Sequence, residues 1–323
     1  MKNSKKIFIL TEAVLAGLLV LVAFLMLWEK NGKEPDRIAA VIQDSGSSRW
    51  AAFKYGLREA AEDAGVELVV VSAEEPLDAA AEEQLAEQEI TNGADAVILQ
   101  PAHGVNLEKL QKAVGKDVPL MLVESPGGEV DFAKIPVTGP DNYAMGEALA
   151  EELLMDSGGK LSGKTIGLLL PEEKTESILK REAGFREAIS GTGADIVWSF
   201  SGKILKQEKT LPKEQQPVDF VTALDDESLT AAGEASAANN LKGALVYGIG
   251  NSTEAVYYLD MGDVQKVVVP DDFNRGYKSL TETAKKLHSP FYKMKSSQVD
   301  YTVLSREELF SEENQELLFT MNQ

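Results

Sequence analysis

Apolar runs and amphipathic runs alternate along most of the chain. Short continuous apolar segments, which are typical of strands buried on both faces, lie at 38–42, 68–71, 96–99 and 118–123. Between them, apolar residues recur at helical spacing, as from Trp50 to Ala64, and Gly65 is placed to end that helix. This rhythm predicts β-α-β units and a parallel sheet covered by helices on both faces.

The pattern breaks at residues 135–142 and then starts again. A helix is expected near 143–155, and further strands are expected at 165–170, 195–200, 220–224, 244–249 and 267–269. Two successive β-α-β runs predict two doubly wound lobes, with binding loops at the C-terminal ends of the strands. The polar segment 201–219 has weak periodicity and two prolines, so we interpret it as a loop or a degraded helix.

A longer apolar stretch, residues 7–28, precedes this alternation. It carries one charge, Glu12, and its 22 residues are enough to cross a bilayer core, which needs roughly 20. Three lysines precede it, so the positive-inside bias predicts that everything after it is exported. We expect residues 1–30 to be a transmembrane anchor and 31–36 to be a linker. A cleaved secretory signal is the alternative, although no small-x-small cleavage site follows the stretch.

Composition narrows the function of the exported part. The absence of cysteine excludes a lipid-carrying cysteine, disulfides and cysteine metal sites. A net charge of −20 argues against nucleic acid binding and against adhesion to anionic lipid. His103 and His288 lie far apart and have no partner at metal-ligand spacing, so we expect no metal site and no cofactor.

No sequence motif indicates nucleotide binding or catalysis once the expected elements around it are considered. Residues 158–165 match the phosphate-loop pattern G-x-x-x-x-G-K-[ST], but such a loop follows a strand and opens a helix. Here a helix is expected before it and a strand after it, so a glycine-rich turn explains the match. The chain also lacks a G-x-S-x-G elbow and a cysteine nucleophile, and we expect no enzymatic activity.

Several polar motifs follow the expected strands in a specific order. They are Gly46-Ser47-Ser48-Arg49-Trp50, Glu124-Ser125, Asp141-Asn142, Arg181 within KREAGFREA, and Asp225-Asp226. With the strand-helix rhythm, this order resembles the periplasmic solute-binding proteins of the ribose and galactose type, whose fold the LacI-type repressor cores share. The resemblance covers roughly residues 37–305. It implies an α/β type I periplasmic-binding-protein fold, with two doubly wound parallel-sheet lobes, a hinge, and a ligand held between the lobes.

The resemblance also implies how the chain divides. Crossovers between the lobes would fall near 138–140, 270–271 and 297–301. The N-lobe would then comprise 37–139 plus 272–298, and the C-lobe 140–271 plus 299–323. Because a membrane anchor stands where the repressors carry DNA-binding helices, no nucleic acid partner is expected.

Family contact positions in the N-lobe carry over one at a time. Arg49 and Trp50 fall on the aromatic pair that opens the first helix. Trp50 could stack on a sugar face or be partly buried core, and Arg49 brings a charge suited to an acidic or highly polar ligand. Glu124 keeps the acid of the family's acidic-basic pair, whereas Ser125 loses the base. Gln100 falls on the polar residue that ends the third strand.

In the C-lobe, Arg181 falls on the family arginine, whose planar fork can donate two hydrogen bonds to adjacent oxygens. A surface ion pair with Glu182 or Glu187 is the alternative for Arg181. Asp225 falls on the family's Asn or Asp after its strand, or it caps the next helix. The expected ligand-binding set is completed by Ser47, Asn142, Asn251 and Asp271.

Two positions depart from the family pattern. Gly250 stands where the family has an aspartate, with Asn251 beside it, and Pro270 stands where it has a glutamine, with Asp271 beside it. Both family residues grip sugar hydroxyls. The replacement of both residues predicts either a ligand other than a standard pentose or hexose, or weaker binding.

The sequence therefore predicts a monomeric, single-pass membrane-anchored protein whose binding domain is extracytoplasmic. It would capture a small polar, sugar-like ligand and deliver it to an ABC transporter permease. The alternative is a ligand-sensing subunit that signals to a membrane histidine kinase without transport.

Overall fold

A computed structural model describes residues 14–22, 35–43, 46–73, 78–102, 104–125, 135–172 and 174–321. The chain divides into two compact units, Met1–Pro35 and Asp36–Gln323. In the first unit, residues 14–22 are helical. None of the helices among the described residues is long and apolar enough to span a membrane. The rest of the expected anchor, and His103, lie outside the described residues.

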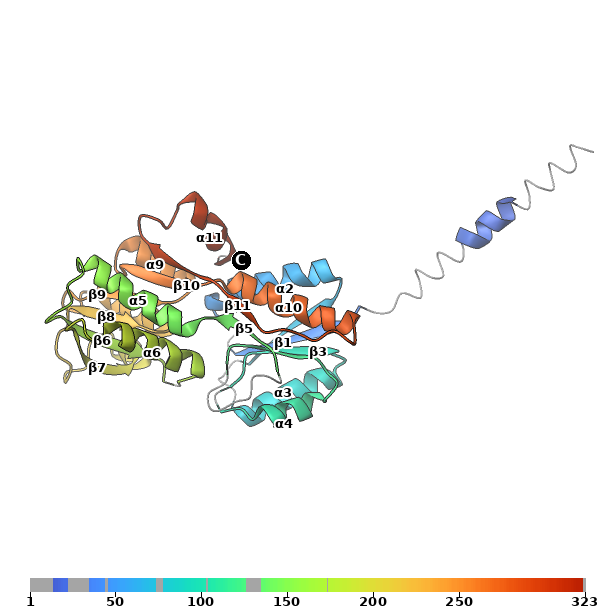
Figure 1. Cartoon of the computed structure of the whole chain (residues 1–323), viewed down its shortest axis with the longest axis horizontal. Helices are drawn as coiled ribbons and strands as arrows, with labels where there is room; N and C mark the ends of the chain where they lie inside the picture. Colours follow the sequence, from blue (N-terminus) through green and yellow to red (C-terminus); the bar gives the residue numbers. More distant parts are fainter. Residues whose placement is uncertain are drawn as a thin grey trace, which may run out of the picture. The chain divides into compact units, whose positions relative to one another are not determined.

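Within Asp36–Gln323, the N-lobe is built around a six-stranded parallel sheet of order β11-β5-β4-β3-β1-β2. Its strands are β1 (Arg37–Gln43), β2 (Glu67–Ala73), β3 (Ala96–Leu99), β4 (Leu120–Val123), β5 (Val137–Pro140) and β11 (Ser297–Val299). Figure 1 shows helices on both of its faces. One face packs on α2 (Ala51–Ala64) and α10 (Asp272–His288), the other on α3 (Ala79–Thr91) and α4 (Leu107–Val114).

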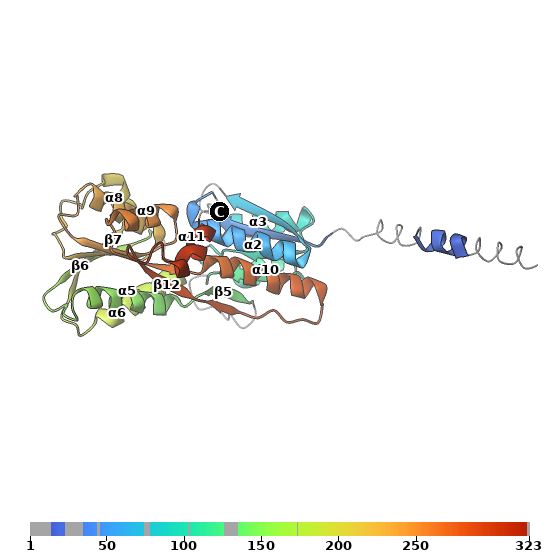
Figure 2. The ribbon, with the colours of Figure 1, turned by 90° about the horizontal axis from the view of Figure 1, so that it is seen from above.

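The C-lobe repeats this plan with a sheet of order β12-β10-β9-β8-β6-β7, in which only the β10–β12 pair is antiparallel among the described pairs. Its strands are β6 (Thr165–Leu170), β7 (Asp195–Ser201), β8 (Phe220–Ala223), β9 (Leu245–Ile249), β10 (Lys266–Pro270) and β12 (Tyr301–Ser305). In Figure 2, α5 (Asn142–Asp156) and α6 (Glu176–Ile189) lie on one side, and α8 (Asp226–Ala237) and α9 (Thr253–Met261) on the other.

The predicted fold class, two α/β lobes with parallel sheets, is confirmed. Continuous apolar strands are buried on both faces, as in β3 and β4, where every residue is buried. Gly65 ends α2 in the left-handed conformation with φ of 64°. Residues 158–164 form a turn between α5 and β6, which begins at Thr165, and this order excludes a phosphate loop. The segment 201–219 contains a short helix, α7 (Gly202–Glu208), followed by an irregular stretch.

Pairs of glycines bring two helices of each lobe into close contact. In the N-lobe, a Cβ on Gly56 would lie 2.1 Å from the carbonyl oxygen of Phe273, and one on Gly276 would lie 2.2 Å from that of Phe53. In the C-lobe, Gly146 and Gly184 play the same part between α5 and α6, each with a main-chain oxygen 2.1 Å from a Cβ built there. Only glycine permits this approach of the backbones, and it fixes where the neighbouring side chains point.

The chain passes from one sheet to the other three times, after β5, after β10 and after β11. Beyond β12 it continues through η2 (Glu312–Asn314) into α11 (Gln315–Met321), which packs against α2 and against η1 (Ser48–Trp50). Leu317 of α11 and Ala52 of α2 pack with the C-lobe's apolar core. The C-terminal segment therefore contacts both lobes.

Candidate ligand-binding site between the lobes

The C-lobe contributes Arg181, which lies on α6 three residues before Gly184. The close helix crossing places its guanidinium beside Asn142 at the start of α5. Its Nε donates to Asn142 Oδ1 at 2.8 Å, and its Nη1 donates to the carbonyl oxygen of Leu224 at 2.9 Å. Both acceptors are neutral, and the two bonds use two of the five N–H groups of an arginine.

The charge of Arg181 interacts with residues of both lobes. Burial lowers the pKa of its guanidinium, while the carboxylates of Glu124 in the N-lobe and Asp225 in the C-lobe act in the opposite direction. In the N-lobe, the positive charge of Arg275 acts to lower this pKa, and the carboxylate of Asp272 acts to raise it. Ionised groups of the two lobes thus converge around this arginine.

The N-lobe contributes Glu124, directly after β4. Its backbone has a φ of 99°, which is rare and strained for a residue other than glycine. Its Oε1 accepts from Arg275 Nη1 at 3.1 Å, and its Oε2 accepts from Gln100 Nε2 at 3.5 Å. Gln100 is held in turn by the backbone N–H of Gln43, which donates to its Oε1 at 3.1 Å. The carboxylate of Glu124 is thereby fixed at the C-terminal ends of the N-lobe strands.

Arg275, on the buried face of α10, is a member of this site that sequence reasoning missed. Its side chain is 5 % exposed, and its Nη2 lies 2.9 Å from Oδ1 of Asp272, which is 3 % exposed. Its guanidinium carbon lies 5.1 Å from the ring centroid of Trp50 and 5.2 Å from that of Phe53. Glu124 therefore has a basic partner after all, supplied by α10 in place of position 125.

The surroundings of the buried Asp272 disfavour the charged form of its carboxyl group. Burial raises its pKa to about 6, although the positive charge of Arg275 acts to lower it. Its Oδ1 is close to Arg275 but poorly angled for a hydrogen bond, and neither this oxygen nor Arg275 Nε has a hydrogen-bond partner among the described residues. Both atoms belong to side chains that are almost fully buried.

Hydrogen bonds join the two lobes directly. Asn251 of the C-lobe donates through Nδ2 to the carbonyl oxygen of Arg49 at 2.7 Å and to the carboxylate of Asp272. Ser48 Oγ donates to Glu254 Oε2 at 2.6 Å, which lowers the pKa of Glu254. These contacts hold the first helical turn after β1 against the start of α9.

The departure at Gly250 has a structural reason. A Cβ at this position would lie 2.6 Å from Oδ1 of Asp226, so an aspartate here would require the Asp226 carboxylate to move. The same oxygen of Asp226 accepts from the backbone N–H groups of Asn251 and Ser252, each at 2.9 Å. Asp226 thus holds the loop that carries Asn251, and burial raises its pKa.

Other predicted residues are engaged elsewhere. Trp50 is 1 % exposed, lies in the N-lobe core, and donates its Nε1–H to the carbonyl oxygen of Gln43 at 3.0 Å. Asp225 accepts from the N–H of Glu227 at 3.1 Å and caps α8, as its alternative interpretation holds. Burial raises the pKa of Asp225.

Asp271 caps α10 by accepting from the N–H of Asn274 at 3.0 Å, so at the second crossover Asp272 is the carboxylate that reaches the interlobe site. Ser47 precedes η1 and Ser125 follows Glu124, both half-buried. The Nε of Arg49 is buried without a partner among the described residues.

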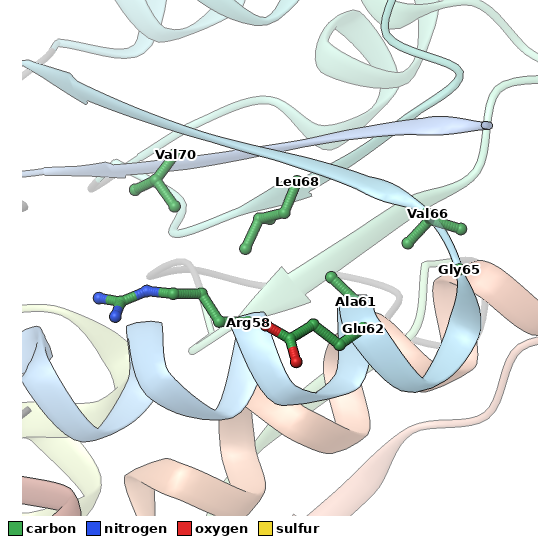
Figure 3. A pocket seen from close by; sticks show the side chains of 7 residues that line it. All are labelled: Arg58, Ala61, Glu62, Gly65, Val66, Leu68 and Val70. Carbon is green, nitrogen blue, oxygen red and sulfur yellow. The ribbon is translucent and has the colours of Figure 1, made fainter. Parts of the chain in front are cut away.

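A surface depression of about 410 Å³ lies away from this site (Figure 3). It is formed by α2 and the edge strand β2, and its lining includes Arg58, Glu62 and Leu68. A second depression, of about 180 Å³, lies in the C-lobe around Leu241 and Gln265. None of the predicted ligand-binding residues lines either one. Among the described residues, no group of three His, Asp or Glu side chains could hold a metal ion.

A signal for Arg275 and Asp272 was present in the sequence. On α10 the buried positions include 272, 275, 276, 279, 280 and 283, which is helical spacing. Two charged residues on the buried face of a helix are rare unless they are paired. Their partner Glu124, 151 positions earlier in the chain, is not visible in that pattern.

Comparison with known proteins places this geometry in context. The family model described as a periplasmic binding protein domain matches residues 38–288. The D-ribose/D-allose-binding protein of Pseudomonas aeruginosa is 26 % identical over 193 residues, which cover 56 % of this chain and 58 % of that relative. The match therefore spans less than two thirds of the relative's length.

Solved structures share the fold at lower identity. A sugar ABC transporter sugar-binding protein from Bacillus halodurans has a TM-score of 0.70 and 17 % identity, covering 85 % of this chain and 99 % of its own. The XylFII–LytSN complex has a TM-score of 0.73 and 16 % identity, with the same two coverages. With the family match over most of the chain and two lobes of the same fold, the chain belongs to the periplasmic binding protein family.

Proposed function

We propose that this protein binds a small polar, sugar-like ligand between its lobes and delivers it to an ABC transporter permease, without catalysing a reaction. The observation that carries this proposal is the convergence of charged groups from both lobes. Arg181 and Asp225 come from the C-lobe, and Glu124, Asp272 and Arg275 come from the N-lobe. A polyhydroxylated ligand offers hydroxyl groups that accept from guanidinium groups and donate to carboxylates.

Closure would follow from contacts made in one state only. A ligand that bonds to Arg181 and Glu124 together holds the lobes closed, because those bonds are lost when the lobes separate. We propose that the N-lobe comprises 37–139 plus 272–298, that the C-lobe comprises 140–271 plus 299–323, and that they move about the three passages between the sheets. Asn251 and Arg49 add a direct contact to the closed state.

Family membership implies an extracytoplasmic binding domain. We propose that residues 1–30 anchor it to the membrane, because residues 7–28 form one apolar stretch after three lysines. We further propose that the anchored protein acts as a monomer. The descriptions of two relatives, a D-ribose/D-allose-binding protein and a sugar ABC transporter's sugar-binding protein, support a sugar and a permease as partners.

Thermal unfolding with a panel of pentoses, hexoses, polyols and nucleosides tests ligand binding. A ligand at about 100 times its Kd adds about 2.7 kcal/mol, which raises the Tm by several degrees. Arg181→Ala should abolish the shift. Lys180→Ala, a neighbouring change at an exposed position of the same helix, should preserve it. A panel in which no compound shifts the Tm would rule out the proposed ligand class.

A sensing subunit is the second candidate, and one observation favours it. A protein of this fold forms the XylFII–LytSN complex, so the fold supports partners other than a permease. Cells that lack the protein distinguish the two functions. Loss of uptake of the labelled ligand supports transport, whereas unchanged uptake with loss of the ligand's transcriptional response supports signalling to a kinase.

A further inference from the structure

The segment Lys285–Lys295 differs in charge from the rest of the protein; we name it the basic segment. The whole chain has a net charge of −20, yet residues 283–299 contain no Asp or Glu. The basic segment carries His288 and four lysines, Lys285, Lys286, Lys293 and Lys295. Among the described residues, Lys285 pairs with Glu282 at 3.0 Å, and neither Lys293 nor Lys295 pairs with a carboxylate.

An exposed aromatic residue lies in the middle of the basic segment. Phe291 is 96 % exposed, in the turn between the end of α10 and β11. The turn around it is held firmly. Tyr292 donates its hydroxyl to Glu282 at 2.7 Å, the N–H of Lys295 donates to the same carboxylate at 3.1 Å, and Lys286 Nζ donates to the carbonyl oxygen of Pro290 at 2.5 Å. The fold therefore holds the ring of Phe291 in contact with solvent instead of packing it against the protein.

The basic segment lies at the end of the N-lobe where the chain enters it. His288 Nε2 is 3.9 Å from Asp36 Oδ2, and Asp36 is the first residue of its unit. Seven residues, 29–35, separate that unit from the end of the apolar stretch 7–28. Even fully extended they reach at most about 25 Å. If residues 7–28 cross the membrane, this end of the N-lobe stays close to its surface.

We propose that the basic segment docks on the anionic lipid headgroups of the membrane that holds the anchor, with Phe291 inserted among them. The proposal rests on the anchor proposed above. Lysines near an anionic surface each favour binding by roughly fivefold, and an aromatic ring at the interface adds apolar contact. Because the Debye length is about 8–10 Å, most carboxylates of the lobes are screened from that surface. The whole-chain charge thus does not decide adhesion at this end.

Acidic groups also lie near the basic segment and limit its charge. Asp36 faces His288, and Glu282 offsets Lys285. Nearby on the same end of the sheet, Arg37 lies 3.6 Å from Glu67, and its backbone N–H donates to the carboxylate of Asp95 at 2.8 Å, so this group carries a net negative charge. The charge left for lipid is that of Lys286, Lys293 and Lys295, reduced by these neighbouring carboxylates, which makes the expected attachment weak alone and effective only beside a tether.

The test uses the full chain in vesicles of phosphatidylcholine with or without phosphatidylglycerol. The chain has no cysteine, so Ser289→Cys introduces one labelling site in the exposed turn and Glu214→Cys introduces one in the C-lobe. A lipid-borne quencher should quench the label at 289 in phosphatidylglycerol vesicles and spare the label at 214. Lys293→Ser with Lys295→Ser should reduce the docked fraction relative to the undocked by about tenfold or more. Lys180→Ser with Lys213→Ser, the same charge change elsewhere, should leave it unchanged.

Several results would overturn docking. Equal quenching at 289 without phosphatidylglycerol would show that the lipid charge is irrelevant, and quenching that appears only at high protein density would point to a second copy of the chain. A carbonate wash reports on the anchor separately. If the chain leaves the vesicles in that wash, the anchor proposal fails, and docking, which depends on the tether, fails with it. If the chain stays and the label at 289 is not quenched, docking alone is rejected.

Discussion

Each lobe carries an arginine beside a glycine-mediated helix crossing, but the two arginines have different partners. Arg181 of the C-lobe bonds to neutral oxygens, those of the Asn142 amide and the Leu224 carbonyl. Arg275 of the N-lobe lies against two carboxylates, those of Glu124 and Asp272. The same packing plan therefore gives one arginine whose charge remains available and one whose charge is neutralised inside the protein.

Because of this difference, we expect the two lobes to offer different hydrogen-bonding groups to a ligand. An arginine held by neutral acceptors can use its charge and its remaining N–H groups on a ligand. An arginine between two carboxylates mainly stabilises the fold, and we propose that its carboxylates accept hydrogen bonds from ligand hydroxyls. We infer that the C-lobe supplies donors to the ligand and that the N-lobe supplies acceptors.

The largest expected effect comes from removing the N-lobe arginine. Arg275→Met leaves Glu124 and the buried Asp272 without a counter-charge, and we expect a loss of about 3–5 kcal/mol in the free energy of unfolding. Arg181→Met leaves two neutral acceptors unpaired and removes a positive charge that acts on Glu124 and Asp225 without bonding to either, so it should cost less, about 1–3 kcal/mol. Chemical denaturation of both variants at pH 7 measures the difference. An equal or larger loss for Arg181→Met would contradict the contrast between the lobes.

The pH dependence of stability gives the next largest effect. The pKa of Asp272 is raised to about 6 from an ordinary 3.8, so between these values the folded state binds more protons than the unfolded state. Stability is therefore highest below pH 4 for this group and falls as pH rises to 6, by about 3 kcal/mol in total. Asp272→Asn should remove that part of the slope in Tm measured from pH 4 to 7.

A control separates Asp272 from a second buried acid of the N-lobe. Burial raises the pKa of Glu82 to about 8, although its Oε1 accepts from the N–H of Ala102 at 2.7 Å. Glu82 thus adds a fall in stability that continues from pH 4.5 to 8. Glu82→Gln should flatten the profile between pH 6 and 8 and keep the part of the fall between 4 and 6 that Asp272 contributes. If Asp272→Asn flattens only the upper range, the assignment to Asp272 is wrong.

The glycine crossings test whether the lobes share one packing plan. Alanine normally favours a helix over glycine by about 1 kcal/mol. Gly276→Ala and Gly146→Ala place a Cβ against main-chain oxygen, so each should instead destabilise by about 1–3 kcal/mol. Gly46→Ala, where nothing lies within 4 Å, is the control and should be nearly neutral. Similar losses in both lobes, read from denaturation midpoints, would support the shared plan, and a gain in either would refute it there.

Most of the fold could be predicted because local patterns encode it. Continuous apolar runs located nine strands within one or two residues, and Gly65 marked a helix end by its chemistry. The short strands β5, β11 and β12 were expected only as crossovers, because their sequences, VTGP, SQV and YTVLS, are not continuous apolar runs. Long-range pairing was harder. The contact of Arg275 with Glu124 joins elements 151 positions apart, and no local pattern specifies it.

Individual site residues were harder still, because one residue type serves two roles. An aspartate after a strand can bind ligand or cap a helix, and both Asp225 and Asp271 cap helices here. Which of two adjacent carboxylates turns inward depends on the phase of the helix. Asp272 and Asp226 turn inward and bond to Asn251, whereas their neighbours Asp271 and Asp225 were the carboxylates expected at the site. The aromatic at position 50 is buried because Arg275 and Phe53 already pack against it.

The smallest effect concerns the direct contact between the lobes. Ser48→Ala removes the hydrogen bond to Glu254, a partly exposed pair, and should cost no more than about 1 kcal/mol of stability. If that bond forms only when the lobes are closed, the same change should weaken ligand binding several-fold without altering the residues that touch the ligand. Thr253→Ala, which keeps the Ser48 contact, is the control. Calorimetric titration of both variants decides the point: equal affinities would mean that the contact persists in the open state and does not bias closure.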